Sequence, residues 1–170
     1  MKGGQTMGYE GSWSGMRKYL EKEMLAESLK GRVRYWCTTY PGMDGCRVFE
    51  IFIDDVYKKQ FAWDTLYADM LKKKIDDSDI TWSSMRHYVD ENSVELRDVH
   101  ICEDFCDALA DYRNQDIKVS IQSDNPIVRM FAILDRRVGK RTLEKLKDDL
   151  DEQPEWLKQF YILRFEAENL

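Results

Sequence analysis

Residues 124–141, DNPIVRMFAILDRRVGKR, give the clearest helical signal in the chain. Pro126 suits the first position of a helix, where its missing N–H removes no hydrogen bond. Asp124 or Asn125 can cap this helix from just outside, and Gly139 is a residue at which it can end. The apolar residues of the stretch recur at helical spacing and predict one buried stripe: Ile127, Met130, Phe131, Leu134 and Val138.

The end of this stretch is strongly basic, and two interpretations of it stay open. Residues 129–147 contain seven cations and two anions, whereas residues 148–155 contain five anions and no cation. In the structural interpretation, the arginines pair with Asp135, Glu166, Glu168 and the acidic run, and so hold the last helices together. In the functional interpretation, they bind a phosphate backbone or an acidic protein surface. The binding candidates are Arg136, Arg137, Lys140 and Arg141.

We favour the structural interpretation, because an Asp-Arg-Arg sequence on a packed helix is commonly tied into local ion pairs. Nucleic acid is further disfavoured, since no aromatic residues alternate with the cations as stacking platforms would require.

The period of the apolar residues changes along the chain. Residues 12–31 predict a helix that ends near Gly31. Alternating residues over 32–40, 46–53 and 56–62 predict three strands, with turns at 41–45 and at Asp54-Asp55. Helical patterns follow, with inward residues that include Leu71 and with Asp64 and Asp98 as expected caps. We therefore expect an α+β fold: an N-terminal helix, a small antiparallel β-sheet of about three strands (residues 32–62), and then a mostly helical C-terminal bundle.

Length and composition predict a single domain over residues 1–170. We divide it into a flexible N-terminus (1–11), a helix, β-meander and helix (12–75), and a helical part (80–170). The formal net charge of −6 argues against broad binding to nucleic acid or an anionic membrane. No secretory signal and no apolar run near the roughly 20 residues of a membrane span are found. Four cysteines are too few for a disulfide scaffold, so we expect a reduced, cytoplasmic protein without a membrane partner.

Three stretches of the chain resemble an uncharacterised family of small bacterial intracellular proteins. They are SLKGRV (residues 28–33), DNPIVRMFAILDRRVGKRTLEKL (124–146) and FYILRFEAE (160–168). Where that family usually has Asp-Gly at the second turn, this sequence has Asp54-Asp55. The resemblance implies a single intracellular unit and no activity, because no function is assigned to the family.

One local cluster of residues, His100-x-Cys102-x₃-Cys106, has a composition that could bind a metal. His100, Cys102 and Cys106 are weak candidates, and Cys37, Cys46 or His87 would have to complete four ligands. We expect structural cysteines instead, and no metal or cofactor. The sequence contains no nucleophile elbow and no phosphate-binding loop.

Of the five tryptophans, Trp36 is the one that could be exposed to solvent, because it lies on the strand face opposite Val33 and Tyr35. If exposed, it would mark a partner surface; the alternative is that a helix covers both sheet faces. We therefore expect a non-enzymatic cytoplasmic protein-interaction or accessory protein. The alternatives are a nucleic-acid-associated protein that uses residues 136–141, or an enzyme whose cleft cannot be recognised from sequence.

Overall fold

The computed structural model describes residues 12–39 and 47–170. The predicted flexible N-terminus and the turn at 41–45 lie outside these residues. The helices and strands, in chain order, are α1 (Trp13–Lys18), the π-helix η1 (Tyr19–Met24), the 3₁₀ helix η2 (Glu27–Leu29), β1 (Val33–Thr39), β2 (Arg47–Ile53), β3 (Val56–Phe61), α2 (Trp63–Lys72), the 3₁₀ helix η4 (Asp77–Asp79), α3 (Trp82–Glu91), α4 (Cys102–Asn114), α5 (Ile117–Ser120), α6 (Pro126–Leu134), α7 (Lys140–Leu146), the 3₁₀ helix η5 (Leu150–Glu152) and α8 (Glu155–Ala167). The prediction of an α+β fold with a three-stranded sheet is confirmed.

The N-terminal helix ends earlier than predicted. The continuous helix stops at Met24 rather than near Gly31; Leu25 is extended, and only the short 3₁₀ helix η2 follows. Leu25 forms an antiparallel bridge with Asp135, and the backbone N–H of Ala26 donates to the carbonyl of Leu134 at 2.9 Å. The backbone groups of this segment are therefore satisfied by a distant part of the chain instead of by a further helical turn.

The sheet is an antiparallel meander in the order β1-β2-β3. Asp54 and Asp55 connect β2 to β3 with positive φ angles of 50° and 63°, as in a type I′ hairpin turn. Aspartate tolerates the left-handed region better than most non-glycine residues. Ion pairs with Arg32 (2.8 Å) and Arg34 (2.6 Å) hold the two carboxylates against β1.

The outer edge of β1 is capped by a side chain from the π-helix. Glu21 is buried, and its Oε1 accepts a hydrogen bond from the backbone N–H of Tyr35 at 2.8 Å. Arg17 holds the same oxygen at 2.9 Å. An edge strand with free N–H groups is a template for unwanted pairing, and a carboxylate at this position removes one such donor.

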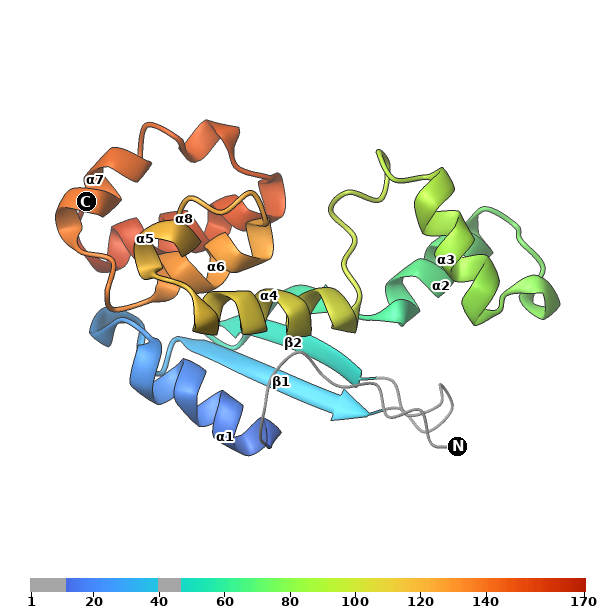
Figure 1. Ribbon diagram of the computed structural model, residues 1–170, viewed down its shortest axis with the longest axis horizontal. Coiled ribbons are helices and arrows are strands. Elements are labelled where there is room, and N and C mark those ends of the chain that lie inside the picture. Colours follow the sequence, from blue (N-terminus) through green and yellow to red (C-terminus); the bar gives the residue numbers. More distant parts are fainter. Residues whose placement is uncertain (1–11, 40–46) are drawn as a thin grey trace.

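The inner face of the sheet is covered by α4, and Phe131 of α6 reaches Tyr35 of β1. Figure 1 shows α4 lying over the strands with the C-terminal helices above it. Phe105 of α4 stacks on Phe49 with ring centroids 4.3 Å apart and lies edge-on to Phe61 and Phe131. These buried rings connect the sheet to the helical part of the chain. Their burial and their ring contacts are favourable terms in folding.

Helix α6 begins as predicted but ends earlier. Pro126 is at its first position, and the Asn125 side chain accepts a hydrogen bond from the N–H of Ile127 at 2.9 Å. The helix stops at Leu134, because Asp135 turns into the bridge with Leu25. Gly139 therefore does not end this helix; it is the N-cap of α7.

Three other expectations about the helices are wrong. Ala62, not Asp64, is the N-cap of α2, and Leu71 is exposed rather than inward-facing. Ile101 is the N-cap of α4, where the Asp104 carboxylate accepts from its N–H at 2.8 Å. The carbonyl of Asp98, the predicted cap, instead accepts a hydrogen bond from a lysine of β3.

Helices α2 and α3 lie at one end of the molecule, away from α5 to α8 at the other end (Figure 1). Trp63 of α2 meets Trp82 of α3 edge-on and donates a hydrogen bond to Glu103 of α4 at 3.0 Å. Over the described parts of the chain, no helix has the length and apolar character needed to cross a bilayer.

Candidate functional site

The outer sheet face (Arg34, Trp36, Glu50, Phe52 and Tyr57) carries the exposed aromatic residues of the sheet. Strand pairing places Arg34 opposite Phe52 and Trp36 opposite Glu50, and Phe52 is in turn opposite Tyr57. Trp36 and Tyr57 are each 52% exposed. Trp36 is therefore on the surface, while its role in binding stays a prediction.

A groove of about 290 Å³ lies beside Trp36. Arg17 of α1 forms part of its wall, together with Arg34, Tyr35, Glu50 and Phe52. Both arginines already have carboxylate partners: Arg17 pairs with the buried Glu21, and Arg34 pairs with the exposed Asp55. An exposed pair such as Arg34–Asp55 contributes only about 0–1 kcal/mol. The groove is thus lined by both aromatic and charged residues.

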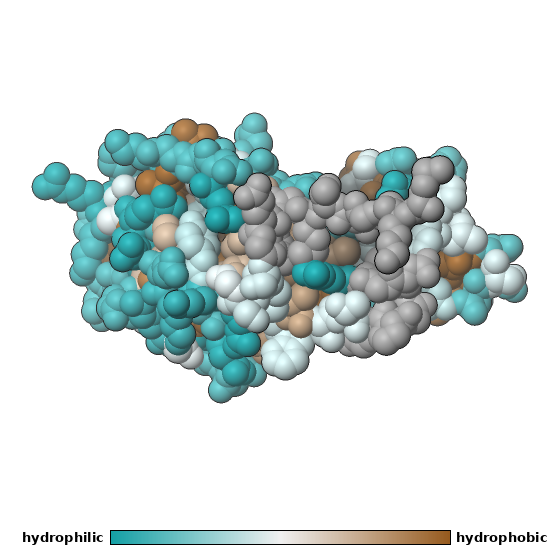
Figure 2. Space-filling model, turned by 60° about the horizontal axis from the view of Figure 1, so that its bottom comes forward, coloured by the Kyte–Doolittle hydropathy of each residue, from teal (hydrophilic) through white to brown (hydrophobic). Residues whose placement is uncertain are grey.

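Figure 2 turns this side of the molecule toward the viewer. Hydrophilic residues dominate the end that carries α1 and α7, and less hydrophilic residues appear toward the middle of the face.

The structure divides the four predicted basic residues into two kinds. Arg137 is bound to Asp135 through its guanidinium, at 2.7 Å for the shortest contact, and its backbone N–H donates to the same carboxylate at 2.7 Å. Lys140 donates to the backbone carbonyl of Glu168 at 3.0 Å. Arg136 and Arg141 are exposed, and no ion pair or hydrogen bond of their guanidinium groups is found within the described residues.

Asp135 is the centre of a buried polar group. Its pair with Arg137 is one of the ion pairs of the structural interpretation, whereas its contact with Tyr112 was not predicted from the sequence. Its side chain is fully buried, and it accepts a hydrogen bond from the Tyr112 hydroxyl as well as those from Arg137. Burial, followed by the charge of Asp135, raises the pKa of Tyr112. The hydrogen bond to Asp135 raises the pKa of Arg137, whose guanidinium also lies over the Tyr112 ring.

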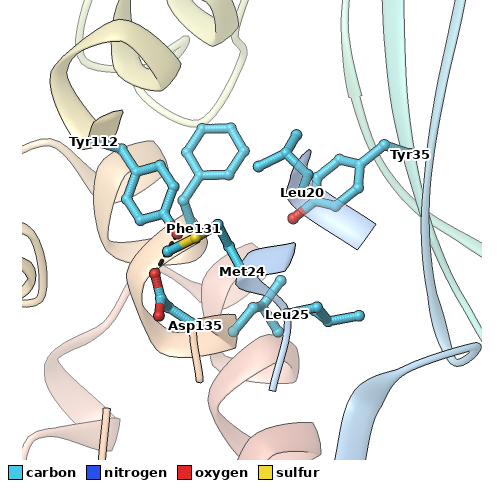
Figure 3. Close-up of a pocket in the computed structure, with 8 residues that line it drawn as sticks. Leu20, Met24, Leu25, Tyr35, Tyr112, Phe131 and Asp135 are labelled. Atoms are coloured by element: carbon cyan, nitrogen blue, oxygen red, sulfur yellow. Dashed lines mark hydrogen bonds between the residues drawn. The ribbon is translucent and has the colours of Figure 1, made fainter. Parts of the chain in front are cut away.

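A small cavity adjoins this group (Figure 3). At its wall the Tyr112 hydroxyl points directly at Asp135, and Leu20, Met24 and Phe131 are among the other residues that line it. Its volume is about 10 Å³, close to the roughly 10–15 Å³ that one water molecule needs. The group can hold the π-helix against α4 and α6. The cavity beside it is too small for a substrate.

Glu168 was predicted to pair with the arginines at 136–141, but its partner is Arg164. The Arg164 guanidinium is buried and contacts Glu168 at 2.6 Å, Ser28 Oγ at 3.2 Å and the carbonyl of Val138 at 3.1 Å. Burial lowers the pKa of Arg164. The i, i+4 spacing of Arg164 and Glu168 was the sequence signal for this pair.

A second buried polar group joins β3 to α8. Lys59 is 8% exposed, donates to the carbonyl of Asp98 at 2.6 Å and lies 4.6 Å from the Trp156 ring centroid. His100 meets the same ring edge-on. Burial lowers the pKa of Lys59 to about 8 and that of His100 to about 4. His100 is therefore neutral near pH 7 and unsuited to acid catalysis.

The predicted weak metal candidates do not assemble into a site in the described ranges, where no group of three or more metal-ligating side chains is found. The Cys102 thiol instead donates to Glu103 Oε2 at 3.0 Å. Burial raises the pKa of Cys106 to about 12 and also raises the pKa of Cys37. Cys46 lies outside the described residues. The three described cysteines are free thiols, and the thiolate that acts as a nucleophile is disfavoured at Cys37 and Cys106.

Comparison with known proteins gives one match: residues 12–165 fit the sequence model of the SF0329 protein family. No curated protein and no solved structure shows significant similarity to the chain.

Proposed function

The chain belongs to the SF0329 protein family, and we propose that it acts as a non-enzymatic protein-interaction protein that binds its partner through the outer sheet face. The family match specifies no reaction, so the proposal depends on the surface residues. The observation that carries it is the exposed Trp36 beside a groove lined by both aromatic and charged residues.

Trp36 and its neighbours have the composition of an interface centre. Tryptophan, tyrosine and arginine are enriched among the residues that contribute most to binding, and such residues lie in pockets with a polar surround. Here Trp36 and Phe52 supply the apolar surface, and Arg17, Arg34 and Glu50 supply the surround. We propose a second protein, different from this one, that inserts an apolar side chain beside Trp36.

The reactive side chains support a role without catalysis. The Cys106 thiol and the His100 imidazole are held in their neutral forms by burial, and the cavity beside Asp135 has room for about one water molecule. The free cysteines fit the reducing environment of a cytoplasm, which is the location we propose.

A photo-cross-linking experiment tests the proposal. The photoreactive residue p-benzoylphenylalanine replaces Tyr57, which leaves Trp36 intact; in the control it replaces Val119 of α5, which is also exposed. We expect a cross-linked partner from position 57 and not from position 119.

The cross-linked partner is then purified and its affinity measured. Trp36→Ala should weaken binding by about 30-fold, the loss typical of a hot-spot residue, and Val119→Ser should leave it unchanged. Thermal unfolding of each variant shows that the fold is retained. Equal affinity of Trp36→Ala and the unmodified protein, or cross-linking only to a second copy of the chain, would refute the proposal.

A further inference from the structure

We propose that Arg136, Arg141 and Lys145, here called the α7 basic patch, dock a short acidic segment of a partner protein. This inference rests on the proposed function, because it assumes a protein partner. The partner would carry an acidic segment, and this segment would bind at a surface separate from Trp36.

The backbone beneath the patch is fixed by buried contacts. The N–H of Arg136 donates to the carbonyl of Met24 at 2.8 Å, and Asp135 bridges to Leu25. Val138 is buried, and its carbonyl accepts from Arg164 at 3.1 Å. The turn that leads into α7 is therefore held at both ends. A rigid base lowers the ordering cost of binding, because only the cationic side chains remain to be ordered.

The cationic side chains of the patch have no ion-pair or hydrogen-bond partner in the described parts of the chain. Arg136 and Arg141 are the arginines there whose side chains form no ion pair, hydrogen bond or aromatic contact, whereas the side chain of Arg137 is bound to Asp135. Lys145 is exposed and likewise without a side-chain partner in the described ranges. Unbound guanidinium groups on a fixed turn are ready to take carboxylates in two-bond contacts.

Two cations of the patch lie close enough on α7 to repel each other. Arg141 and Lys145 are four residues apart and share one helical face, where like charges destabilise a helix. Glu144 lies between them in sequence but forms no ion pair with either in the structure. An anionic partner would relieve this repulsion, so charge complementarity specifies an acidic occupant.

An acidic protein segment fits the patch better than a nucleic acid does. Residues 148–155 carry five anions and directly follow the patch, so an extended phosphate backbone would meet repulsion within a few residues. Residues 136–147 contain no aromatic side chain on which bases could stack. A short segment with two or three carboxylates can contact the patch without reaching the acidic run.

Fluorescence anisotropy with three labelled probes tests the inference: hexaglutamate, hexaglutamine and a single-stranded oligothymidine. The full chain should bind hexaglutamate at least about tenfold more tightly than hexaglutamine, with affinity falling as salt is raised. The double variant Arg136→Gln/Arg141→Gln should lose about tenfold in affinity for hexaglutamate. The matched control, Lys72→Gln/Lys118→Gln, changes net charge equally at exposed positions elsewhere and should lose less than about twofold.

Several outcomes would overturn the inference: no preference for hexaglutamate, an equal loss in both double variants, or tighter arginine-dependent binding of oligothymidine. Thermal unfolding of each variant excludes loss of the fold. The proposed function is tested separately through Trp36→Ala. If that variant loses its partner while hexaglutamate fails to bind, the sheet-face proposal stands and the inference about the patch fails.

Discussion

Replacing Asp135 by alanine is expected to lower the free energy of unfolding by about 3 kcal/mol. The carboxylate is fully buried and accepts hydrogen bonds from the Tyr112 hydroxyl and from the backbone N–H and guanidinium of Arg137. Alanine removes all of these acceptors at once and leaves their donors behind.

The magnitude follows from what each donor loses. The Tyr112 hydroxyl stays buried without an acceptor, which costs about 1–3 kcal/mol. The Arg137 backbone N–H loses a hydrogen bond worth about 1 kcal/mol. The Arg137 side chain is 39% exposed, so water can solvate its guanidinium and the lost ion pair adds at most about 1 kcal/mol.

Urea unfolding followed by tryptophan fluorescence measures the change, and a double-mutant cycle assigns it. In a Tyr112→Phe background the stranded hydroxyl is absent, so Asp135→Ala should cost about 1–2 kcal/mol less than in the unmodified protein. The exposed Arg141→Ala serves as the control and should change stability by less than about 0.5 kcal/mol. A cost of Asp135→Ala below about 1 kcal/mol, or one that Tyr112→Phe leaves unaltered, would refute this reasoning.

Three further predictions use the same unfolding assay. Glu21→Ala should cost about 2 kcal/mol, because the buried Tyr35 N–H loses its acceptor; Glu21→Gln keeps an acceptor oxygen and should cost less, and equal losses would contradict this explanation. Asp55→Gly should stabilise the protein by about 0.5 kcal/mol, because glycine adopts its φ of 63° without strain; a loss of stability would show that the ion pair with Arg34 outweighs backbone strain. Burial lowers the pKa of Lys59 to about 8 from 10.5, so the folded protein binds fewer protons than the unfolded chain between these pH values, and its stability should rise with pH across this interval. Lys59→Met should lack that rise, and an identical pH dependence in both proteins would disprove the assignment.

Local sequence patterns determined the three strands and the start of α6. Alternation over β1 separates the inner face of Tyr35 from the outer face of Trp36, because successive side chains of a strand point in opposite directions. Asn125 and Pro126 mark the start of α6, since capping and the fixed φ of proline act within one turn. Such features depend on neighbours in sequence and can therefore be predicted from it.

The ends of the same elements were decided by distant contacts. The stripe in residues 124–141 continues to Val138, and Val138 is indeed buried, yet the helix stops at Leu134 because Asp135 pairs with Leu25. Gly139, which local rules assign to the end of that helix, caps the next one. Backbone hydrogen bonds between segments more than a hundred residues apart leave no local signal at either end.

The two adjacent arginines show most clearly what only the tertiary structure decided. Arg136 and Arg137 are equivalent in composition and charge, but Arg137 contacts a buried carboxylate while Arg136 remains on the surface. The difference depends on where Asp135 lies relative to Tyr112, which is 23 residues away on α4. Sequence alone therefore predicted the basic end of this segment, whereas the packing of α4, α6 and the π-helix determined which arginine side chain pairs with Asp135 and which has no ion pair among the described residues. The physical reason is that an ion pair is specified by distances in space, and local propensities do not contain those distances.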